Sequence, residues 1–146
     1  MINAQEFFTH ALHDSEAVTT LLANDGGEPN IFEYPCEEEL GDNPGKPYIV
    51  VQNTGTTKAE STKDDAFDSE NDITTIEVTV VTSSKEDAKA VAQTAREEIA
   101  DAMNDQDIVA GEYFIEASTY SDRGVQFDVE SGNYFVTMIY LLEISI

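Results

Sequence analysis

The stretch TTIEVTVVTSSKEDAKAVAQTAREEI, from Thr74 to Ile99, predicts a strand that leads through a polar turn into a helix. In the strand, apolar Ile76, Val78 and Val80 alternate with the polar residues Thr75, Glu77 and Thr79. Successive side chains of a strand point to opposite faces of a sheet. The alternation therefore predicts a sheet that is covered on one face only.

The helical half of this stretch is amphipathic. Ser83 is placed to cap the helix, and Glu86 stands three residues later, as in a capping box. Apolar residues then recur at helical spacing and predict a stripe that packs on the sheet, made of Ala88, Val91, Ala92, Ala95, Ile99, Ala102 and Met103. The opposite side carries Lys85, Lys89, Gln93, Arg96 and Glu97. Such junctions often bind phosphate, but acids in the first turn would repel it, so we interpret this junction as a cap.

The remaining segments complete an α+β fold. Residues 3–23 predict one helix or two, because Asn3 can cap the first turn and Asp14 or Ser15 can start a second helix. Strands are predicted at 47–54 and 111–120, a hairpin at 124–129 and 134–146, and a short extended piece at 31–35. The order is α-β-β-α-β-β-β, which predicts a mainly antiparallel sheet with one or two helices packed on one face.

At 146 residues, 40% of them hydrophobic, the chain fits a single domain over residues 1–146. No apolar run approaches the roughly 20 residues of a membrane span. The N-terminal residues show no basic region before an apolar core, so we expect no signal peptide and an intracellular setting. Cys36 is the only cysteine, which excludes an internal disulfide and a cysteine-cluster zinc site.

The charge is extreme, with 30 Asp and Glu against 7 Lys and Arg and a formal net charge of −23. Such a surface repels nucleic-acid phosphates and anionic lipid. The acids are spread through every segment, which argues against a disordered acidic tail. A DNA mimic that binds a basic protein is one interpretation. Adaptation to molar salt, where the Debye length falls to about 3 Å, suits the composition better, which resembles that of haloarchaeal proteins.

No catalytic or metal site is indicated. His10 and His13 have a spacing suited to two metal ligands, but apart from Asp14, one of many acids, no third ligand is indicated, so we expect them to face solvent. Cys36 precedes three glutamates, and negative charge raises the pKa of a thiol. We therefore expect no enzyme activity and no cofactor.

Two loops are partly similar to ligand-binding motifs but lack residues that those motifs require. Residues 41–47, GDNPGKP, place Pro47 where a phosphate-binding loop needs Ser or Thr. Residues 64–72, DDAFDSEND, are followed by Ile73 and later Thr79, where a calcium loop needs Gly and Glu. We interpret the second loop as a solvated acidic segment.

Four pieces of the chain resemble the tail-completion, or tail-terminator, proteins of long-tailed viruses of bacteria and archaea. They are the N-terminal amphipathic helix, IFEYP followed by PYIVVQ, the strand and helix TTIEVTVVTSSKEDAKAVAQTAREEIADAM, and the hairpin RGVQFDVESGNYFVTMIYLLEI. Together they cover most of the chain in the order of that family. The similarity lies in pattern and spacing rather than in a sharp fingerprint.

The resemblance implies a structural virion protein, assembled in the host cytoplasm and located in the neck of the tail. Such subunits form a ring, usually a hexamer, at the head-proximal end of the tail tube. The implied partners are further copies of the chain, the tail tube protein and the head-closure protein, while DNA only passes through the bore. No membrane partner is implied.

The resemblance also directs attention to two segments. The long acidic loop at 55–72 could reach the bore or the tube, or be a plain surface loop; its candidate residues are Glu60, Asp64, Asp65, Asp68, Glu70 and Asp72. Phe32 and Tyr34 could contact a neighbouring subunit or cover the edge of their own sheet. A head-closure or connector subunit is the nearest alternative, followed by an acidic DNA mimic.

Overall fold

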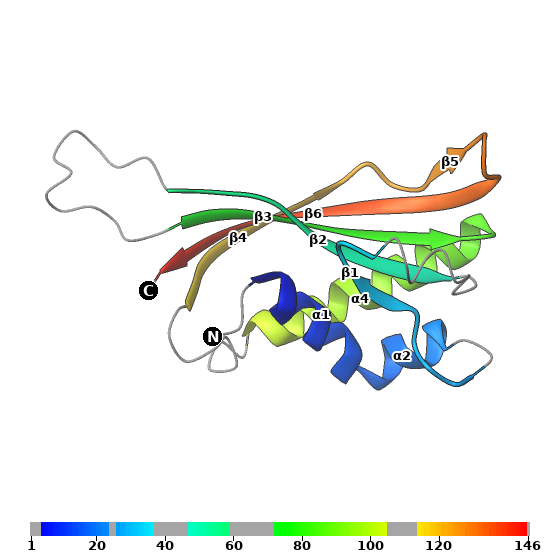
Figure 1. The fold of residues 1–146 in the computed structure, drawn as a ribbon, viewed down its shortest axis with the longest axis horizontal. Helices are drawn as coiled ribbons and strands as arrows, with labels where there is room; N and C mark the ends of the chain where they lie inside the picture. The colour runs from blue at the N-terminus through cyan, green and yellow to red at the C-terminus, as the bar shows by residue number, and fades with distance from the viewer. Residues whose placement is uncertain (1–3, 24–25, 37–46, 59–71, 105–113, 146) are drawn as a thin grey trace, which may run out of the picture.

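The computed structural model describes residues 4–23, 26–36, 47–58, 72–104 and 114–145, and these form three helices and six strands (Figure 1). In chain order the elements are α1 (Ala4–Asp14), α2 (Glu16–Leu22), β1 (Ile31–Glu33), β2 (Tyr48–Lys58), β3 (Asp72–Thr82), α4 (Lys85–Asn104), β4 (Phe114–Asp122), β5 (Gln126–Asp128) and β6 (Asn133–Ser145). The α+β prediction is confirmed. The predicted order gains a second N-terminal helix and the short strand β1.

The six strands form one sheet in the order β1-β2-β3-β6-β4. Only β1 runs parallel to its neighbour, β2; the other pairs are antiparallel. The short strand β5 continues the line of β4 along β6 after a break at residues 123–125. At the break Gly124 has a φ of 74°, and its main-chain N–H donates to the Asp122 carboxylate at 2.7 Å. The sheet therefore has one edge at β1 and another at β4.

All three helices lie on the same face of the sheet, and the hydrophobic core lies between the two layers (Figure 1). The residues predicted from the alternation in β3, Ile76, Val78 and Val80, are all fully buried there. The apolar stripe of α4 packs on them and on β6 through small residues such as Ala88 and Ala95. The predicted one-sided cover of the sheet is thus confirmed for the described residues.

Ser15 divides the N-terminal helical segment into α1 and α2. Its backbone is extended, with φ −86° and ψ 116°, and its hydroxyl accepts a hydrogen bond from the main-chain N–H of Val18 at 3.2 Å. A serine that caps the next helix cannot continue the previous one. The sequence left one helix or two open, and the structure has two; Asn3, the proposed first cap, lies outside the described residues.

The cap of α4 is Ser84 rather than the predicted Ser83. The Ser84 hydroxyl accepts from the main-chain N–H of Asp87 at 3.1 Å, so Asp87 takes the place assigned to Glu86. The shift has a physical cause, because β3 stays paired with β6 up to Thr82 and leaves Ser83 as the link. Thr82 then donates through its hydroxyl to the Ser84 carbonyl at 2.6 Å.

Strand β2 is longer than predicted, so the loop assigned to 55–72 begins and ends within strands. Residues Gly55–Lys58 pair with the start of β3 beyond a bulge, where the Gly55 N–H donates to the Asn53 side chain at 2.9 Å. Threonine-rich segments accept strand geometry readily when a partner strand is present. The hairpin predicted between β2 and β3 is confirmed, while residues 59–71 lie outside the described part of the chain.

Candidate interaction surfaces

The described residues contain no group of His, Cys, Asp and Glu side chains that could hold a metal ion. His10 and His13 are exposed on α1, as expected, while Cys36 is buried. None of the described helices is both long and apolar enough to cross a membrane. The features considered next are surfaces of the described residues that could contact other molecules.

Most of the predicted loop residues fall outside the described chain. They are Glu60, Asp64, Asp65, Asp68 and Glu70. Asp72 is the first residue of β3, where it pairs with Lys58 of β2 and Ile144 of β6 in the sheet register. It therefore belongs to a strand rather than to the loop.

The structure separates the two aromatic residues predicted as subunit contacts. Phe32 is half-buried, and its ring centroid lies 6.4 Å from that of Tyr48, so it packs within the chain. Tyr34 is 45% exposed. Its main chain is fixed on both sides, because its N–H donates to the Val51 carbonyl at 2.9 Å and its carbonyl accepts from the Gln5 side chain at 2.8 Å. A fixed backbone thus presents an exposed aromatic ring at the β1 edge, by which we mean residues 33–35.

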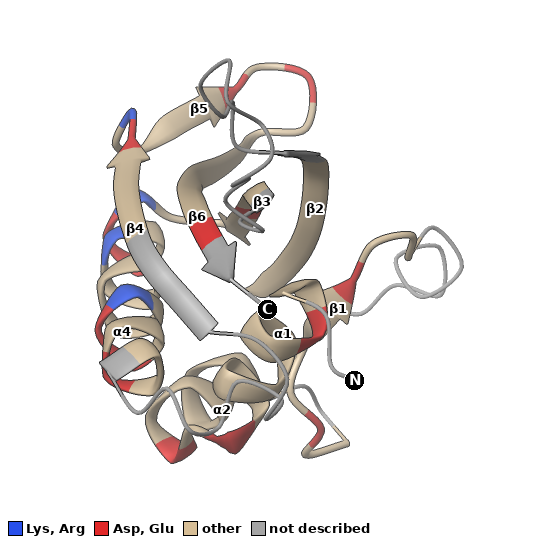
Figure 2. Ribbon diagram, turned by 90° about the vertical axis from the view of Figure 1, so that its left-hand side faces the viewer, with Lys and Arg blue, Asp and Glu red and all other residues tan. Residues whose placement is uncertain are grey.

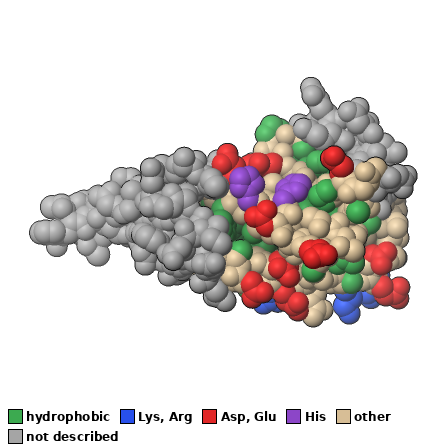
Figure 3. All heavy atoms as spheres, turned by 90° about the horizontal axis from the view of Figure 1, so that it is seen from below, with side chains coloured by type: hydrophobic (Ala, Val, Ile, Leu, Met, Phe, Trp, Pro, Cys, Tyr) green, Lys and Arg blue, Asp and Glu red, His purple; other side chains and the backbone are tan. Residues whose placement is uncertain are grey.

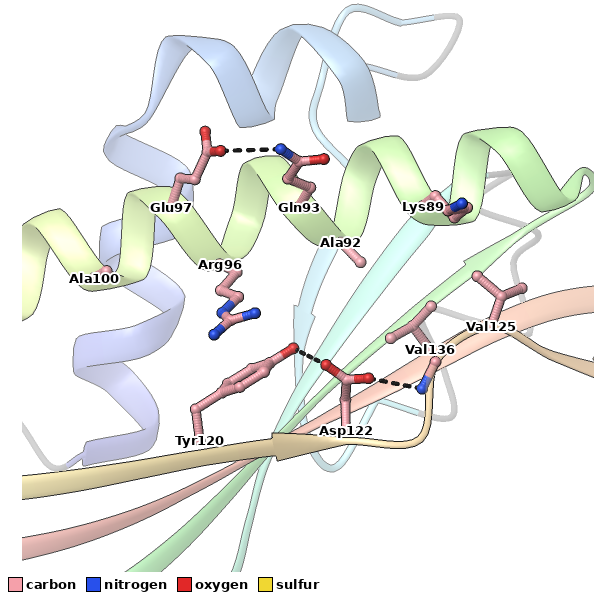
Figure 4. A pocket seen from close by; sticks show the side chains of 11 residues that line it. Lys89, Ala92, Gln93, Arg96, Glu97, Ala100, Tyr120, Asp122, Val125 and Val136 are labelled. Carbon is pink, nitrogen blue, oxygen red and sulfur yellow. Dashed lines mark hydrogen bonds between the residues drawn. The ribbon is translucent and has the colours of Figure 1, made fainter.

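A groove of about 530 Å³ lies between α4 and the end of β4 (Figure 4). We refer to it as the α4–β4 groove. Figure 4 shows α4 on one side and Tyr120 and Asp122 on the other, with Val125 and Val136 nearby. The residues that line it are Lys89, Ala92, Gln93, Arg96, Glu97, Ala100, Tyr120, Asp122, Gly124, Val125 and Val136. The groove thus combines an apolar floor with charged residues at its rim.

Arg96, Tyr120 and Asp122 form a connected set in this groove. The Arg96 guanidinium carbon lies 3.9 Å from the centre of the Tyr120 ring, a cation–π geometry. The Tyr120 hydroxyl donates to the Asp122 carboxylate at 2.5 Å. Burial and this hydrogen bond raise the pKa of Tyr120 to about 12. The pKa of Asp122 is lowered, because its carboxylate accepts this hydrogen bond and a second one from the Gly124 N–H. At neutral pH the groove thus holds a protonated tyrosine and an ionised aspartate in fixed positions.

A column of aromatic rings connects the groove to the core. Tyr140 of β6 packs edge-to-face on Tyr120 at 5.1 Å and on Phe8 of α1 at 5.0 Å. Burial raises the pKa of Tyr140, whose hydroxyl has no hydrogen-bond partner among the described residues. Edge-to-face pairs fix ring orientation. The wall of the groove is therefore anchored in the packed interior.

The described cations gather at this groove. Of the seven Lys and Arg residues, Lys46 and Lys63 lie outside the described chain and the side chain of Lys58 is not described. The four that remain lie on α4 and on the segment after β4, at one edge of the molecule (Figure 2): Lys85, Lys89, Arg96 and Arg123. Of the four, Arg96 interacts electrostatically with Asp122 and contributes to lowering the pKa of that carboxyl.

The surface of α4 separates the two signs of charge. Successive helical residues are about 100° apart around the axis, so Lys85, Lys89 and Arg96 fall within about 40° of one another. The acids Glu86 and Glu97 lie about 100° further round, although Glu97 still lines the groove. The sequence indicated an exposed side of α4 but not this division, and helical angles measured from the apolar stripe were the signal that could have found it.

Viewed from the helix side, the molecule is acidic. Figure 3 shows Asp and Glu side chains around the two histidines and along the lower margin, where the few visible Lys and Arg side chains also lie. The visible cations thus lie at one margin of a surface that is otherwise acidic.

The face of the sheet that carries no described helix is much less charged. Its described side chains are half-buried or exposed and include two glutamates, Glu77 and Glu143, among apolar and threonine residues. The others include Tyr48, Val50, Gln52, Ile73, Thr75, Thr79, Val81, Thr119, Ser121, Phe135, Thr137, Ile139 and Leu141. We refer to this surface as the open face.

No family model and no curated protein match this chain. A solved structure does match in fold, namely a chain in "Virion of native gene transfer agent (GTA) particle". The two chains superpose with a TM-score of 0.65 over 98% of this chain and 95% of the other, at 11% sequence identity. At this identity the likeness is one of fold.

Proposed function

We propose that this protein is a structural component of a virion-like particle, and specifically a tail terminator that forms a ring at the head-proximal end of a tail tube. The observation that carries the proposal is the shared fold with a chain of a gene transfer agent particle, which spans almost the whole of both chains.

The surfaces of the described residues agree with an assembly role. Two sheet edges, an open face of low charge and a groove with charged residues at its rim are features of a protein that binds other proteins. A subunit that uses two different surfaces makes head-to-tail contacts, which close into a ring when the rotation between copies allows it. The proposed partners are further copies of this chain, a tail tube protein and a head-closure protein.

The acidity fits the passage of DNA through such a ring. Phosphate contacts by Lys and Arg are what retain DNA on a protein. A bore lined with carboxylates would instead let the duplex slide. A connector or head-closure subunit of the same neck would use the same surfaces, and the stage at which the ring joins the particle distinguishes the two.

We further propose that the protein works at high salt. With a net charge of −23 per copy, contact between copies is opposed by a long-range repulsion. At molar salt the Debye length shrinks to about 3 Å, and this repulsion is screened.

The test is the mass of the purified protein by light scattering in molar KCl and in dilute buffer, with negative-stain images of both. We expect a ring of about six copies with a central opening, the number being that implied by the family resemblance, and partial dissociation in dilute buffer. A ring that is indifferent to salt would contradict the high-salt proposal alone. A compact monomer at every salt and protein concentration would contradict the ring and favour an acidic DNA mimic.

A further inference from the structure

We propose that the α4–β4 groove is one half of the contact between neighbouring copies of this chain, and that the β1 edge of the next copy fills it. The inference rests on the proposed ring and specifies the surfaces that build it. It assigns Lys89 and Arg96 as the receiving cations and Glu33 with Tyr34 as the inserted side chains.

The groove has the chemistry to receive an acidic and aromatic segment. Its floor includes Ala92, Val125 and Val136. Its charged lining residues are Lys89, Arg96, Glu97 and Asp122. The two carboxylates already accept hydrogen bonds, Glu97 from Gln93 and Asp122 from Tyr120. Its volume of about 530 Å³ is in the range of sites that enclose small ligands. Arg96 stays exposed although it covers the Tyr120 ring, so its guanidinium can still bind a carboxylate or a second aromatic ring.

Charge complementarity argues for a second copy as the occupant. Two copies that each carry a charge of −23 repel one another wherever acids meet acids. The groove edge carries every cation with a described side chain, and one of them, Arg96, already interacts electrostatically with Asp122. Among the described surfaces, contact through this edge therefore brings cations of one copy against the acids of the next.

The β1 edge offers a matching pair of side chains. Glu33 is half-buried and Tyr34 is 45% exposed. One oxygen of the Glu33 carboxylate accepts from the Gln5 side chain at 3.0 Å, which holds the carboxylate in place. A carboxylate has further acceptor capacity in its second oxygen. An anchored carboxylate beside an exposed ring fits a groove that has Lys89 and Arg96 at its rim and an apolar floor.

The topology lets each copy use both surfaces at once. Strand β1 is at one end of the sheet order and β4 is at the other. Figure 2 shows the Lys and Arg side beside α4 and β4, with β1 across the molecule from it. One copy can thus give its β1 edge to one neighbour and receive another in its groove. Such a head-to-tail contact generates a ring or an open filament rather than a closed dimer.

The first experiment compares two variants of equal charge by light scattering and sedimentation in molar KCl. In the groove variant, Lys89→Gln with Arg96→Gln, we expect ring dissociation to shift to a protein concentration at least about tenfold higher, as when one side of a contacting charge pair is removed. The control, Ala17→Glu with Ala90→Glu, makes the same change of −2 at exposed helical positions outside the groove lining. We expect it to shift dissociation less than about threefold. Circular dichroism melts confirm that both variants fold.

The second experiment tests the pairing of the two surfaces by mixing. A groove-blocked chain, Lys89→Glu with Arg96→Glu, keeps its β1 edge, and an edge-blocked chain, Glu33→Ala with Tyr34→Ala, keeps its groove. We expect each to be monomeric alone and an equal mixture to form complexes of one copy of each, with no rings. No association in the mixture, or rings from either variant alone, would overturn the assignment.

The wild-type protein separates the two proposals. Wild-type rings that persist equally in the groove variant would overturn the groove contact and leave the proposed ring in place. A wild-type monomer under all conditions would overturn both. A third outcome concerns DNA. If the wild type binds a DNA duplex and the groove variant does not, while both form rings equally well, nucleic acid is the occupant of the groove and the inference is overturned.

Discussion

The same strands form both faces of the sheet, but the side chains on the two faces differ in burial. On the helix-covered face, Ile76, Val78 and Val80 of β3 are fully buried. On the open face, their neighbours Thr75, Glu77 and Thr79 are only half-buried. A packed interior penalises each change of volume or polarity, whereas a half-exposed surface of β-branched residues tolerates both. The covered face thus specifies the fold, and the open face is available for contact.

The largest difference should appear when side chains on the two faces are shortened. Met138 and Ile139 are adjacent in β6 and point to opposite faces, and Met138 is 0% exposed. We expect Met138→Ala to lower the free energy of unfolding by about 2–5 kcal/mol, because it removes buried surface and leaves a cavity. Ile139→Ala should cost about 1 kcal/mol. Urea unfolding measures both, and equal losses would show that the open face is packed against something in the folded protein.

Adding or removing a hydroxyl group should change the stability differently on the two faces, by less than the shortening of a side chain does. Val80→Thr places a hydroxyl in the interior, where an unpaired polar group costs about 1–3 kcal/mol. The reverse change on the open face, Thr79→Val, should leave the unfolding midpoint within about 0.5 kcal/mol of the wild type. A large stabilisation by Thr79→Val would instead indicate that this side of β3 is shielded from water.

At the junction between β3 and α4, substitution of Ser83 and of Ser84 should lower the stability by different amounts. Ser84→Ala removes the bond to the Asp87 N–H and should cost about 1 kcal/mol. Ser83→Ala should have almost no effect, because Ser83 is exposed and only links β3 to α4. Thermal melts of the two variants decide between them, and the opposite ranking would restore Ser83 as the cap.

The smallest effects concern pH at the edge where the two faces meet. The folded pKa of Asp122 is below its ordinary value of 3.8, so its contribution to stability is present above about pH 4 and is lost as the pH falls through the folded pKa. We expect Asp122→Asn to be slightly less stable than the wild type at neutral pH, and the difference to vanish in acid. If the difference in stability between the variant and the wild type persists at low pH, the negative charge of Asp122 is not its cause.

The pKa shift of Tyr120 is in the opposite direction and affects the stability at alkaline pH. Its folded pKa is raised from 10.0 to about 12, so its contribution is complete below pH 10 and is lost as the pH rises towards 12. The tyrosinate absorbance of the folded protein should therefore include a component that ionises near pH 12 and is missing in Tyr120→Phe. A titration unchanged by the substitution would contradict the placement of this ring.

The alternation in β3 and the apolar stripe of α4 were enough to predict the layers, because burial imposes a period on the sequence. The length of β2 was not predictable in the same way, since Gly55–Lys58 are strand only because β3 lies beside them. Arg96 was predicted on the outer side of its helix, and its contact with Tyr120 depends on a strand distant in the chain. Local pattern thus predicts which side is buried, while partner-dependent features require the tertiary structure.

The division of charge around α4 restricts how the gene for this protein can change in length. One residue inserted or deleted in the middle of α4 would rotate everything after it by about 100°. Arg96 would then leave the groove, and Ile99 would leave the core at the same time. A deletion would put Glu97 in the place of Arg96, and an insertion would put Ala95 there. Either change would harm folding and the proposed contact between copies together. Length variants of this protein are therefore expected in the connections between elements rather than inside α4.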